Sequence, residues 1–576
     1  MIKKNKKIVI LALDGLDFKL TKKYLKAGLL PNFKKLAKNG FFSSLKTTTP
    51  PQSPVAWASF ITGARPAEHG VFDFIVRNPK NYLLSPVFSP GSRRSILKKP
   101  PFWKKLGNQG IGSEILFLPV TYPPQKLHGN LISGMGIPDI LGTEGTFTLF
   151  TTDKKLLKGR RGRRIKLQGK KDCFKGAILG PKYQTFKDIT FSKLPLEVFP
   201  KKGSAVIKIQ KQTVDLKPKQ FSRFIKLKFK LGAWRKIHGF GKFFLASLKP
   251  LILYLSPINI DPEKPVFDIS YPKNFAQKLA SHYGLFISLG LPHDTWALNE
   301  GIFREKDFLF QAEEILAKKE QIILDRLKKS KKEVFIGYFG TCDQVQHMFF
   351  KHLDSKSKYK NVIPYFYQKM DKVVDRVLNK IDKKTLLVVL SDHGFASFDW
   401  EVNLNTWLKK ESFLTLKSGK QSAELYENVD WAKTHAFAAG FNTLYINRKG
   451  REAEGIVTKN QANKLIKNLK AKLEAFKHPK TKKTIVKRAY SRKDLGLRGN
   501  QEGPDLIVGY YKGFRASWET AVGAVPKKVV CRREQKWSGD HLFDASEIPG
   551  VIFANQKLNL KNPFIGDVAK QVLPIA

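Results

Sequence analysis

Four short apolar runs are distributed along the chain, and each of them stops abruptly at polar residues. They span Ile8–Leu13, Ile115–Pro119, Val334–Phe339 and Leu386–Leu390. Unbroken apolar runs of this length are typical of strands that are covered on both faces. Helical patterns lie between them, at Leu20–Asn39, Phe310–Lys329 and Tyr365–Ile381. This alternation of strands and helices predicts an α/β fold built on a doubly wound sheet.

The alternation is interrupted between residues 151 and 300, where short segments and basic residues dominate. Within this interval, apolar residues alternate with lysines from Phe224 to Lys230. Such alternation is typical of a half-buried strand with a solvated face, although a nucleic-acid groove is the alternative. A chain of 576 residues also exceeds what one hydrophobic core usually organises. We therefore predict a catalytic core in two parts, residues 1–150 and 301–576, separated by an inserted, basic, β-rich cap at residues 151–300.

The formal net charge of +56 raises the question of nucleic-acid or membrane-surface binding. The lysines are spread along the whole chain and define no single face, so we expect no specific nucleic-acid binding. The first apolar run is too short for a secretory signal, and no run approaches the roughly 20 apolar residues of a membrane span. We expect no transmembrane segment and a cytoplasmic protein. A reducing compartment also fits the three widely spaced cysteines, Cys173, Cys342 and Cys531.

Acidic residues follow three of the predicted strands. Asp14 comes directly after the first run, Asp392 follows the fourth after one serine, and Asp343 lies shortly after the third. In an open α/β sheet, ligands gather at the carboxyl ends of the strands. The three carboxylates are therefore expected to converge, although a single aspartate after a strand is commonplace.

Two histidines accompany these carboxylates. His347 follows Asp343 by four residues, which places both side chains on one side of a helix. His393 is adjacent to Asp392, and Gly394 permits a close turn after them. A mixed Asp/His set without cysteine suits zinc, with manganese as the alternative. A core histidine satisfied by a hydrogen bond is the competing interpretation for His347.

Ser53 is the candidate nucleophile. It precedes Pro54 and an apolar stretch that ends at Gly63, a pattern that predicts Ser53 as the N-cap of a helix and the proline as its first residue. Capping alone would explain this serine. The same position also places its hydroxyl where the N–H groups of a helix start favour a bound phosphate.

Taken together, these segments resemble the alkaline phosphatase superfamily, specifically its type I phosphodiesterase and nucleotide pyrophosphatase branch. The matching elements are a strand-end Asp-Gly at Asp14, a hydroxyl residue ten positions before Gly63, and Pro66-Ala-Glu-His-Gly-Val71. They continue in the order of that branch with Asp343 and His347, with Asp392-His-Gly, and with His541 near the C-terminus. The resemblance implies an alkaline phosphatase-like three-layer α/β fold.

The resemblance also implies a two-metal hydrolase that cleaves phosphodiester or nucleotide pyrophosphate bonds through a phosphoseryl intermediate at Ser53. Its substrate would be a small anionic phosphate ester, and the two divalent ions are expected to be zinc, with manganese possible. His69 is assigned a structural role. One implied metal site consists of Asp343, His347 and His541, and the other consists of Asp14, Asp392, His393 and the Ser53 oxygen.

Two departures from the family pattern leave alternatives open. Ser53 stands where threonine is usual, and Asp73 lies in the stretch where the family has an asparagine that cradles the phosphoryl group. An aspartate facing the substrate would repel it, so a phosphomonoesterase or phosphotransferase on the same metals is one alternative. A non-catalytic basic protein that binds nucleic acid or a membrane surface is the other. A sulfatase is not expected, because the Cys-x-Pro-x-Arg signature is absent.

Overall fold

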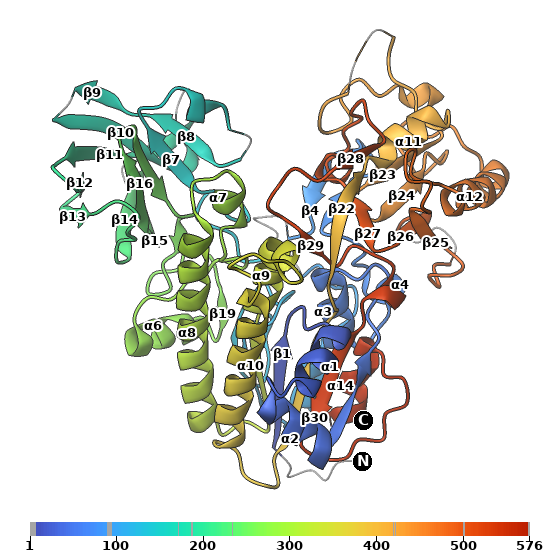
Figure 1. The fold of residues 1–576 in the computed structure, drawn as a ribbon, viewed down its shortest axis with the longest axis horizontal. Coiled ribbons are helices and arrows are strands. Elements are labelled where there is room, and N and C mark those ends of the chain that lie inside the picture. The colour runs from blue at the N-terminus through green and yellow to red at the C-terminus, as the bar shows by residue number, and fades with distance from the viewer. Residues whose placement is uncertain are drawn as a thin grey trace. The chain divides into compact units, whose positions relative to one another are not determined.

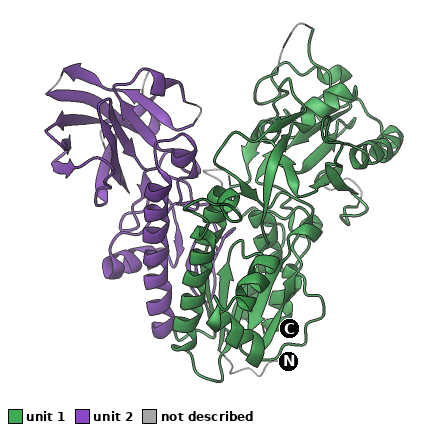
Figure 2. Ribbon diagram, in the orientation of Figure 1, with its two compact units in different colours: residues 1–89, 95–114, 330–576 green, residues 90–94, 115–329 purple. Residues whose placement is uncertain are grey.

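The computed structural model describes residues 7–88, 95–159, 161–170, 172–185, 188–232, 234–418, 420, 422–498 and 502–573. The chain divides into two compact units, shown in Figure 2. Unit 1 comprises residues 1–89, 95–114 and 330–576, and unit 2 comprises residues 90–94 and 115–329. The insertion predicted at residues 151–300 lies within unit 2, which extends beyond it at both ends.

Unit 1 is organised around β1 (Ile8–Leu13), which pairs in parallel with β20 (Val334–Phe339) and with β21 (Leu386–Leu390). Every residue of these three strands is buried, as their unbroken apolar sequences predict. Antiparallel to β21 runs β30 (Gly550–Ala554), and β2 (Phe41–Leu45) pairs with β30. The predicted α/β class is confirmed, and the sheet is mixed.

The segment predicted as one helix from Leu20 to Asn39 forms two helices instead. Pro31 is the first residue of the second helix, because proline lacks the N–H that an uninterrupted helix would need there. The pattern at Tyr365–Ile381 corresponds to α10. The helices of unit 1 that accompany the central sheet (Figure 1) are α1 (Phe18–Lys26), α2 (Pro31–Asn39), α3 (Ser53–Thr62), α4 (Pro66–His69), α5 (Phe102–Asn108), α9 (Thr341–Phe349), α10 (Val362–Leu378) and α14 (Ile565–Val572).

Unit 1 contains a second group of sheets that the sequence analysis did not anticipate. It has its own hydrophobic cluster, which includes Leu444, Leu469 and Val508. One sheet consists of β27 (Gly513–Ala516), β22 (Ala396–Val402), β28 (Val530–Arg532) and β29 (Gly539–Asp540), and the other of β23 (Ala436–Ala439), β24 (Thr443–Ile446), β26 (Leu506–Tyr510) and β25 (Val486–Ser491). Helices α11 (Leu404–Lys410), α12 (Lys459–Glu474) and α13 (Trp518–Ala521) belong to the same region.

Unit 2 is rich in β structure, with the long α8 (Glu305–Lys329) at its end. The alternation from Phe224 to Lys230 appears as β14 (Ile225–Leu231), in which Ile225, Leu227 and Phe229 are buried and the lysines are exposed. The run at Ile115–Pro119 provides only the end of β5 (Ser113–Leu116), because the backbone turns at Phe117, where φ is 64°. Strands that lie wholly within unit 2 include β7 (Thr148–Thr151), β10 (Cys173–Gln184), β11 (Ile189–Pro200), β12 (Ala205–Ile209), β13 (Gln212–Leu216), β15 (Arg235–Gly241), β16 (Phe243–Leu248) and β17 (Leu251–Leu255). Among the described helices of both units, none is both long and apolar enough to span a membrane.

Candidate metal centre

Three aspartates meet at the carboxyl edge of the central strands. Asp14 follows β1 directly, Asp392 follows β21, and Asp343 lies in the first turn of α9 after β20. All three are buried. Because β1 runs parallel to both neighbouring strands, the chain delivers these carboxylates to one edge of the sheet, as the sequence predicts.

Three histidines share an orientation that leaves one ring nitrogen free to bind a metal. In each of them Nδ1 lies within hydrogen-bond distance of a backbone carbonyl oxygen. A carbonyl only accepts, so Nδ1 carries the proton and Nε2 keeps its lone pair. The pairs are His347 with Gly539 at 2.8 Å, His393 with Gly394 at 3.1 Å, and His541 with Pro51 at 2.8 Å.

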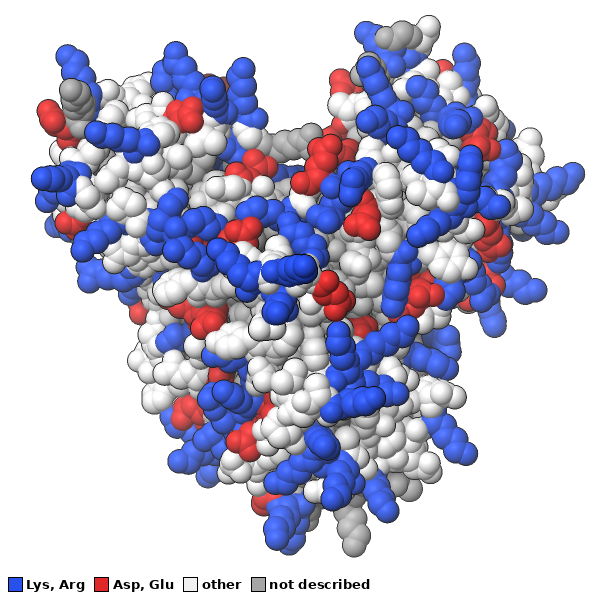
Figure 3. Space-filling model, in the orientation of Figure 1, with Lys and Arg blue, Asp and Glu red and all other residues white. Residues whose placement is uncertain are grey.

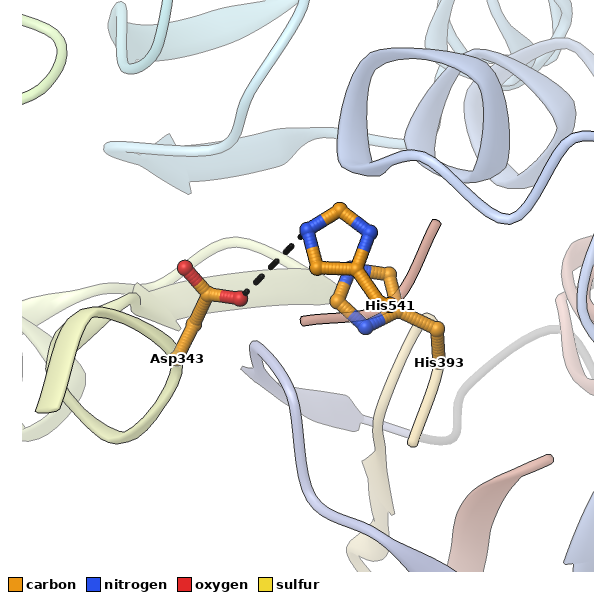
Figure 4. A group of neighbouring side chains, drawn as sticks. All are labelled: Asp343, His393 and His541. Atoms are coloured by element: carbon orange, nitrogen blue, oxygen red, sulfur yellow. Dashed lines mark ion pairs between the residues drawn. The ribbon is translucent and has the colours of Figure 1, made fainter. Parts of the chain in front are cut away.

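The free Nε2 atoms face the carboxylates. His347 Nε2 lies 3.5 Å from one oxygen of Asp343, and His541 Nε2 lies 3.9 Å from the other. His393 Nε2 is 3.1 Å from Asp392 and 3.6 Å from Asp14. Figure 4 shows the His393 and His541 rings against each other, with centroids 3.8 Å apart, and Asp343 beside them.

Two sets of potential ligand atoms are compact enough for a metal ion, each within 4.8 Å of one another. One set matches Asp14, Asp392 and His393 of the predicted second site. The other differs from the prediction, since it contains Asp343, His393 and His541, while His347 lies at the side of Asp343. The structure thus brings all the predicted ligands together, and their division between two ions stays a prediction.

Ser53 lies against the same groups. Its Oγ is 3.1 Å from His393 Nε2 and 3.4 Å from Asp14 Oδ1. The expectation that Ser53 is the N-cap is wrong: Gln52 occupies that position, and Ser53 is the first residue of α3. The hydroxyl is therefore not used in capping and points at the carboxylate and imidazole.

Sequence reasoning missed two side chains that hold Asp14. Trp57 Nε1 donates to Asp14 Oδ2 at 3.0 Å, and the Tyr338 hydroxyl donates to the same oxygen at 2.7 Å. The other oxygen, Oδ1, is the one near Ser53 and His393. Trp57 stands one helical turn after Ser53, which is the only sequence signal for its position.

The electrostatics of the cluster favour a bound cation. Burial, followed by the negative charge of Asp14, raises the pKa of Asp343 and of Asp392 well above their ordinary range. Burial also lowers the pKa of His347 to about 3, so its imidazole is neutral. Asp343 Oδ1 and Asp392 Oδ2 are buried without a hydrogen-bond partner among the described residues. Neutral imidazoles beside orphaned carboxylate oxygens are a donor set that fits divalent metal ions.

Asp73 is engaged by the protein. Its Oδ2 accepts hydrogen bonds from Gln52 Nε2 at 2.9 Å and from the backbone N–H groups of Phe441 and Asn442 at 3.0 and 3.1 Å. Its Oδ1 accepts from the Ile75 N–H at 3.3 Å. Burial raises the pKa of Asp73 to about 6 despite these donors. The carboxylate thus ties together loops next to Ser53.

Like Asp73, His69 is buried and hydrogen-bonded to other groups of the protein. It is fully buried, its Nδ1 accepts from the Val71 N–H at 3.2 Å, and its Nε2 lies 2.9 Å from the Ser59 hydroxyl. With both ring nitrogens used, it fits the predicted structural role.

A sequence model of the type I phosphodiesterase / nucleotide pyrophosphatase family matches residues 8–178 and 268–517. The chain belongs to this family. The match includes every candidate ligand except His541, and it leaves out residues 179–267, inside the predicted insertion. Membership of the type I phosphodiesterase / nucleotide pyrophosphatase family makes the chain a phosphoester hydrolase and agrees with its buried Asp/His groups. No curated protein matches the chain.

Two solved structures resemble the chain at low sequence identity. Phosphonoacetate hydrolase from Sinorhizobium meliloti 1021, in complex with phosphonoacetate, is 12% identical with a TM-score of 0.45, over 98% of this chain and 94% of that one. Human ectonucleotide pyrophosphatase / phosphodiesterase 5 is 11% identical with a TM-score of 0.43, over 99% and 96%. Similarity at this level does not indicate a substrate for this chain.

Proposed function

We propose that this chain is a two-metal hydrolase of phosphodiester or nucleotide pyrophosphate bonds, with Ser53 as its nucleophile. The observation that carries the proposal is the position of Ser53 Oγ, 3.1 Å from His393 and 3.4 Å from Asp14. His393 takes part in both compact sets of ligand atoms, so the hydroxyl lies where the two sets meet. Membership of the family supplies the class of reaction.

The residues present would hold two divalent ions. Zinc suits the nitrogen and oxygen ligands best, with manganese as the alternative. When bound, such ions lower the pKa of a hydroxyl nucleophile and neutralise charge on the phosphoryl oxygens. One ion is assigned to Asp343, His347 and His541, and the other to Asp14, Asp392, His393 and Ser53.

The chain's own groups account for the course of the reaction. Ser53 Oγ forms a bond to phosphorus while the bond from phosphorus to the leaving oxygen breaks, and the hydroxyl proton reaches the leaving group through solvent. The backbone N–H of Ser53, the first residue of α3, would donate to a phosphoryl oxygen; Pro54 has no N–H, and the N–H groups of Val55 and Ala56 donate to the Gln52 carbonyl at 2.9 Å. Water then bonds to phosphorus, the bond to Oγ breaks, and a proton from that water returns to Ser53.

The proposed substrate is a small anionic phosphate ester. The hydrogen bonds to Asp73 from Gln52 and from two backbone N–H groups support diester cleavage, because they direct that carboxylate to the protein. A phosphomonoesterase or phosphotransferase would use the same residues.

The test is metal analysis of the purified protein alongside hydrolysis of chromogenic phosphate monoesters and diesters. We expect about two metal equivalents and faster cleavage of the diester; metal-free protein with full activity would contradict the proposal, and faster cleavage of the monoester would favour the alternative.

A further inference from the structure

The segment Trp537–His541 contains one candidate metal ligand, His541, and contacts another, His347. Its last residue is His541, and its Ser538 and Gly539 bond to both ends of the His347 residue. Ser538 N–H donates to the His347 carbonyl oxygen at 2.6 Å, and the Gly539 carbonyl accepts from His347 Nδ1 at 2.8 Å. The Trp537 ring stacks on the His347 imidazole with centroids 3.8 Å apart.

This docking on α9 requires the absence of a side chain at Gly539. A Cβ atom there would lie 2.6 Å from the Gln346 carbonyl oxygen and 2.7 Å from Phe350 Cβ. Both distances are shorter than carbon atoms tolerate, so the segment approaches α9 at a distance that only glycine allows.

Asp540 connects the two histidines through this segment. Its Oδ2 accepts from Trp537 Nε1 at 2.8 Å, and its Oδ1 accepts from the backbone N–H groups of His541 and Leu542 at 2.8 and 3.2 Å. Asp540 is 1% exposed. Because both oxygens are used within the protein, this carboxylate is not a metal ligand itself.

Arg515 completes the arrangement. It is fully buried, and its Nη1 donates to Asp540 Oδ2 at 2.6 Å while Nε donates to the Ala516 carbonyl at 2.7 Å. The guanidinium lies 5.1 Å from the ring centroids of both Phe398 and Trp518. A buried ion pair of this kind is often no more stabilising than apolar residues of the same volume. A contribution to stability therefore does not explain the Arg515–Asp540 ion pair. Its effect on the geometry of the neighbouring residues is a better explanation.

We propose that Asp540 is a positioning residue that holds both histidines of one metal site, His347 through the Trp537 ring and His541 through its backbone. The inference rests on the proposed function, since it concerns the site assigned to Asp343, His347 and His541. Removing a residue that orients a metal ligand typically lowers the affinity of the site for its metal by about 10- to 100-fold. Asp540 differs from an ordinary partner of this kind because one carboxylate serves two ligands of the same ion.

The test is a zinc titration of the full-length protein, freed of metal, against a chromogenic chelator. Asp540→Asn keeps an oxygen for the backbone N–H groups but presents an amide to the donors of Trp537 and Arg515. We expect one zinc equivalent to bind about 10- to 100-fold more weakly and the other to be unchanged. His541→Ala removes a ligand of the same site and should weaken the same equivalent more strongly.

Two further variants separate positioning from a general loss of stability. Trp537→Phe keeps the ring on His347 but removes its N–H, so the same equivalent should weaken by a smaller factor. It also serves if Asp540→Asn fails to fold. Asp544→Asn is the matched control, because this buried aspartate bonds to Ser546 and Tyr490 and to neither histidine. It should lower the melting temperature without changing either zinc affinity.

Unchanged affinity of both equivalents in Asp540→Asn and Trp537→Phe, with two equivalents bound by the wild type, would overturn this inference and leave the proposed function standing. Equal weakening of both equivalents would overturn it as well, since it would indicate a general disturbance. A wild-type protein that binds no zinc or manganese would overturn the proposed function and this inference with it.

Discussion

The Nε2 atom of His393 lies 3.1 Å from the hydroxyl oxygen of Ser53, although the two residues are 340 positions apart in the sequence. The His393 ring also stacks on that of His541, with centroids 3.8 Å apart. The His393 imidazole therefore contacts the proposed nucleophile, the strand-end aspartates Asp14 and Asp392, and the ring of His541. A candidate active site assembled from such distant segments depends on the central sheet, which brings the strand ends together.

Tyr338 should tune the metal site that contains Asp14. Tyr338→Phe removes a 2.7 Å hydrogen bond to Asp14 while Trp57 keeps its own bond to the same oxygen. We expect zinc affinity at one equivalent to fall by about 10-fold, the low end of the effect of such partners. Tyr24→Phe is the matched control, because the Tyr24 hydroxyl is buried without a hydrogen-bond partner among the described residues. Equal affinities in the two variants would show that the bond to Asp14 has no influence on the metal.

Metal-free protein should lose stability as the pH rises. Burial raises the pKa of Asp14, and burial with neighbouring negative charge raises that of Asp343 and Asp392. A carboxyl group with a raised pKa stabilises the fold below its ordinary pKa of about 4, and this contribution is lost as the pH rises through the raised value. Burial lowers the pKa of the candidate ligands His347, His393 and His541, so above about pH 7 the carboxyl groups dominate the pH dependence among these ligands.

Thermal denaturation of chelator-treated and metal-loaded protein across this pH range provides the measurement. The melting temperature should fall with pH in the metal-free protein and vary much less in the loaded one, since bound cations offset the buried negative charge. A metal-free melting temperature that rises or stays constant would contradict this account of the cluster.

Salt should affect the encounter with substrate more than the chemical step. On the face drawn in Figure 3, lysine and arginine side chains are spread over the surface. Their field attracts small anionic esters, so kcat/KM should fall between about 50 and 200 mM salt while kcat changes less. Over the same range, a polynucleotide-binding protein with 6 to 10 phosphate contacts would lose roughly 10³- to 10⁵-fold in affinity. Submicromolar nucleic-acid binding with that slope, and no metal-dependent hydrolysis, would favour the non-catalytic alternative.

The sequence alone predicted the parts of the site that depend on local pattern. Apolar runs ending at Asp14 and Asp392 place carboxylates at strand ends, and the four-residue spacing of Asp343 and His347 places them on one face of a helix. The capping role of Ser53 was predicted wrongly. The N-cap residue has non-helical backbone angles, and Gln52 adopts them, with φ −109° and ψ 139°, whereas Ser53 is already the first helical residue.

Other features depend on tertiary contacts that no local pattern encodes. Tyr338 contacts Asp14 across 324 positions of the chain, and Arg515 contacts Asp540 across 25 positions.

The helix expected from Leu20 to Asn39 is divided at Pro31, and here the local signal for a break was present in the sequence.

The central claim is that Ser53 is the nucleophile of a metal-dependent hydrolase, and Ser53→Ala tests it most directly. Ser59→Ala, in the same helix but bonded to His69, is the matched control. Metal content and hydrolysis of a chromogenic diester should be measured on both variants and the wild type. The account predicts that Ser53→Ala binds two metal equivalents and loses at least about 10³-fold in kcat, as removal of a nucleophile does elsewhere, while Ser59→Ala remains active. Hydrolysis by Ser53→Ala at the wild-type rate would contradict it.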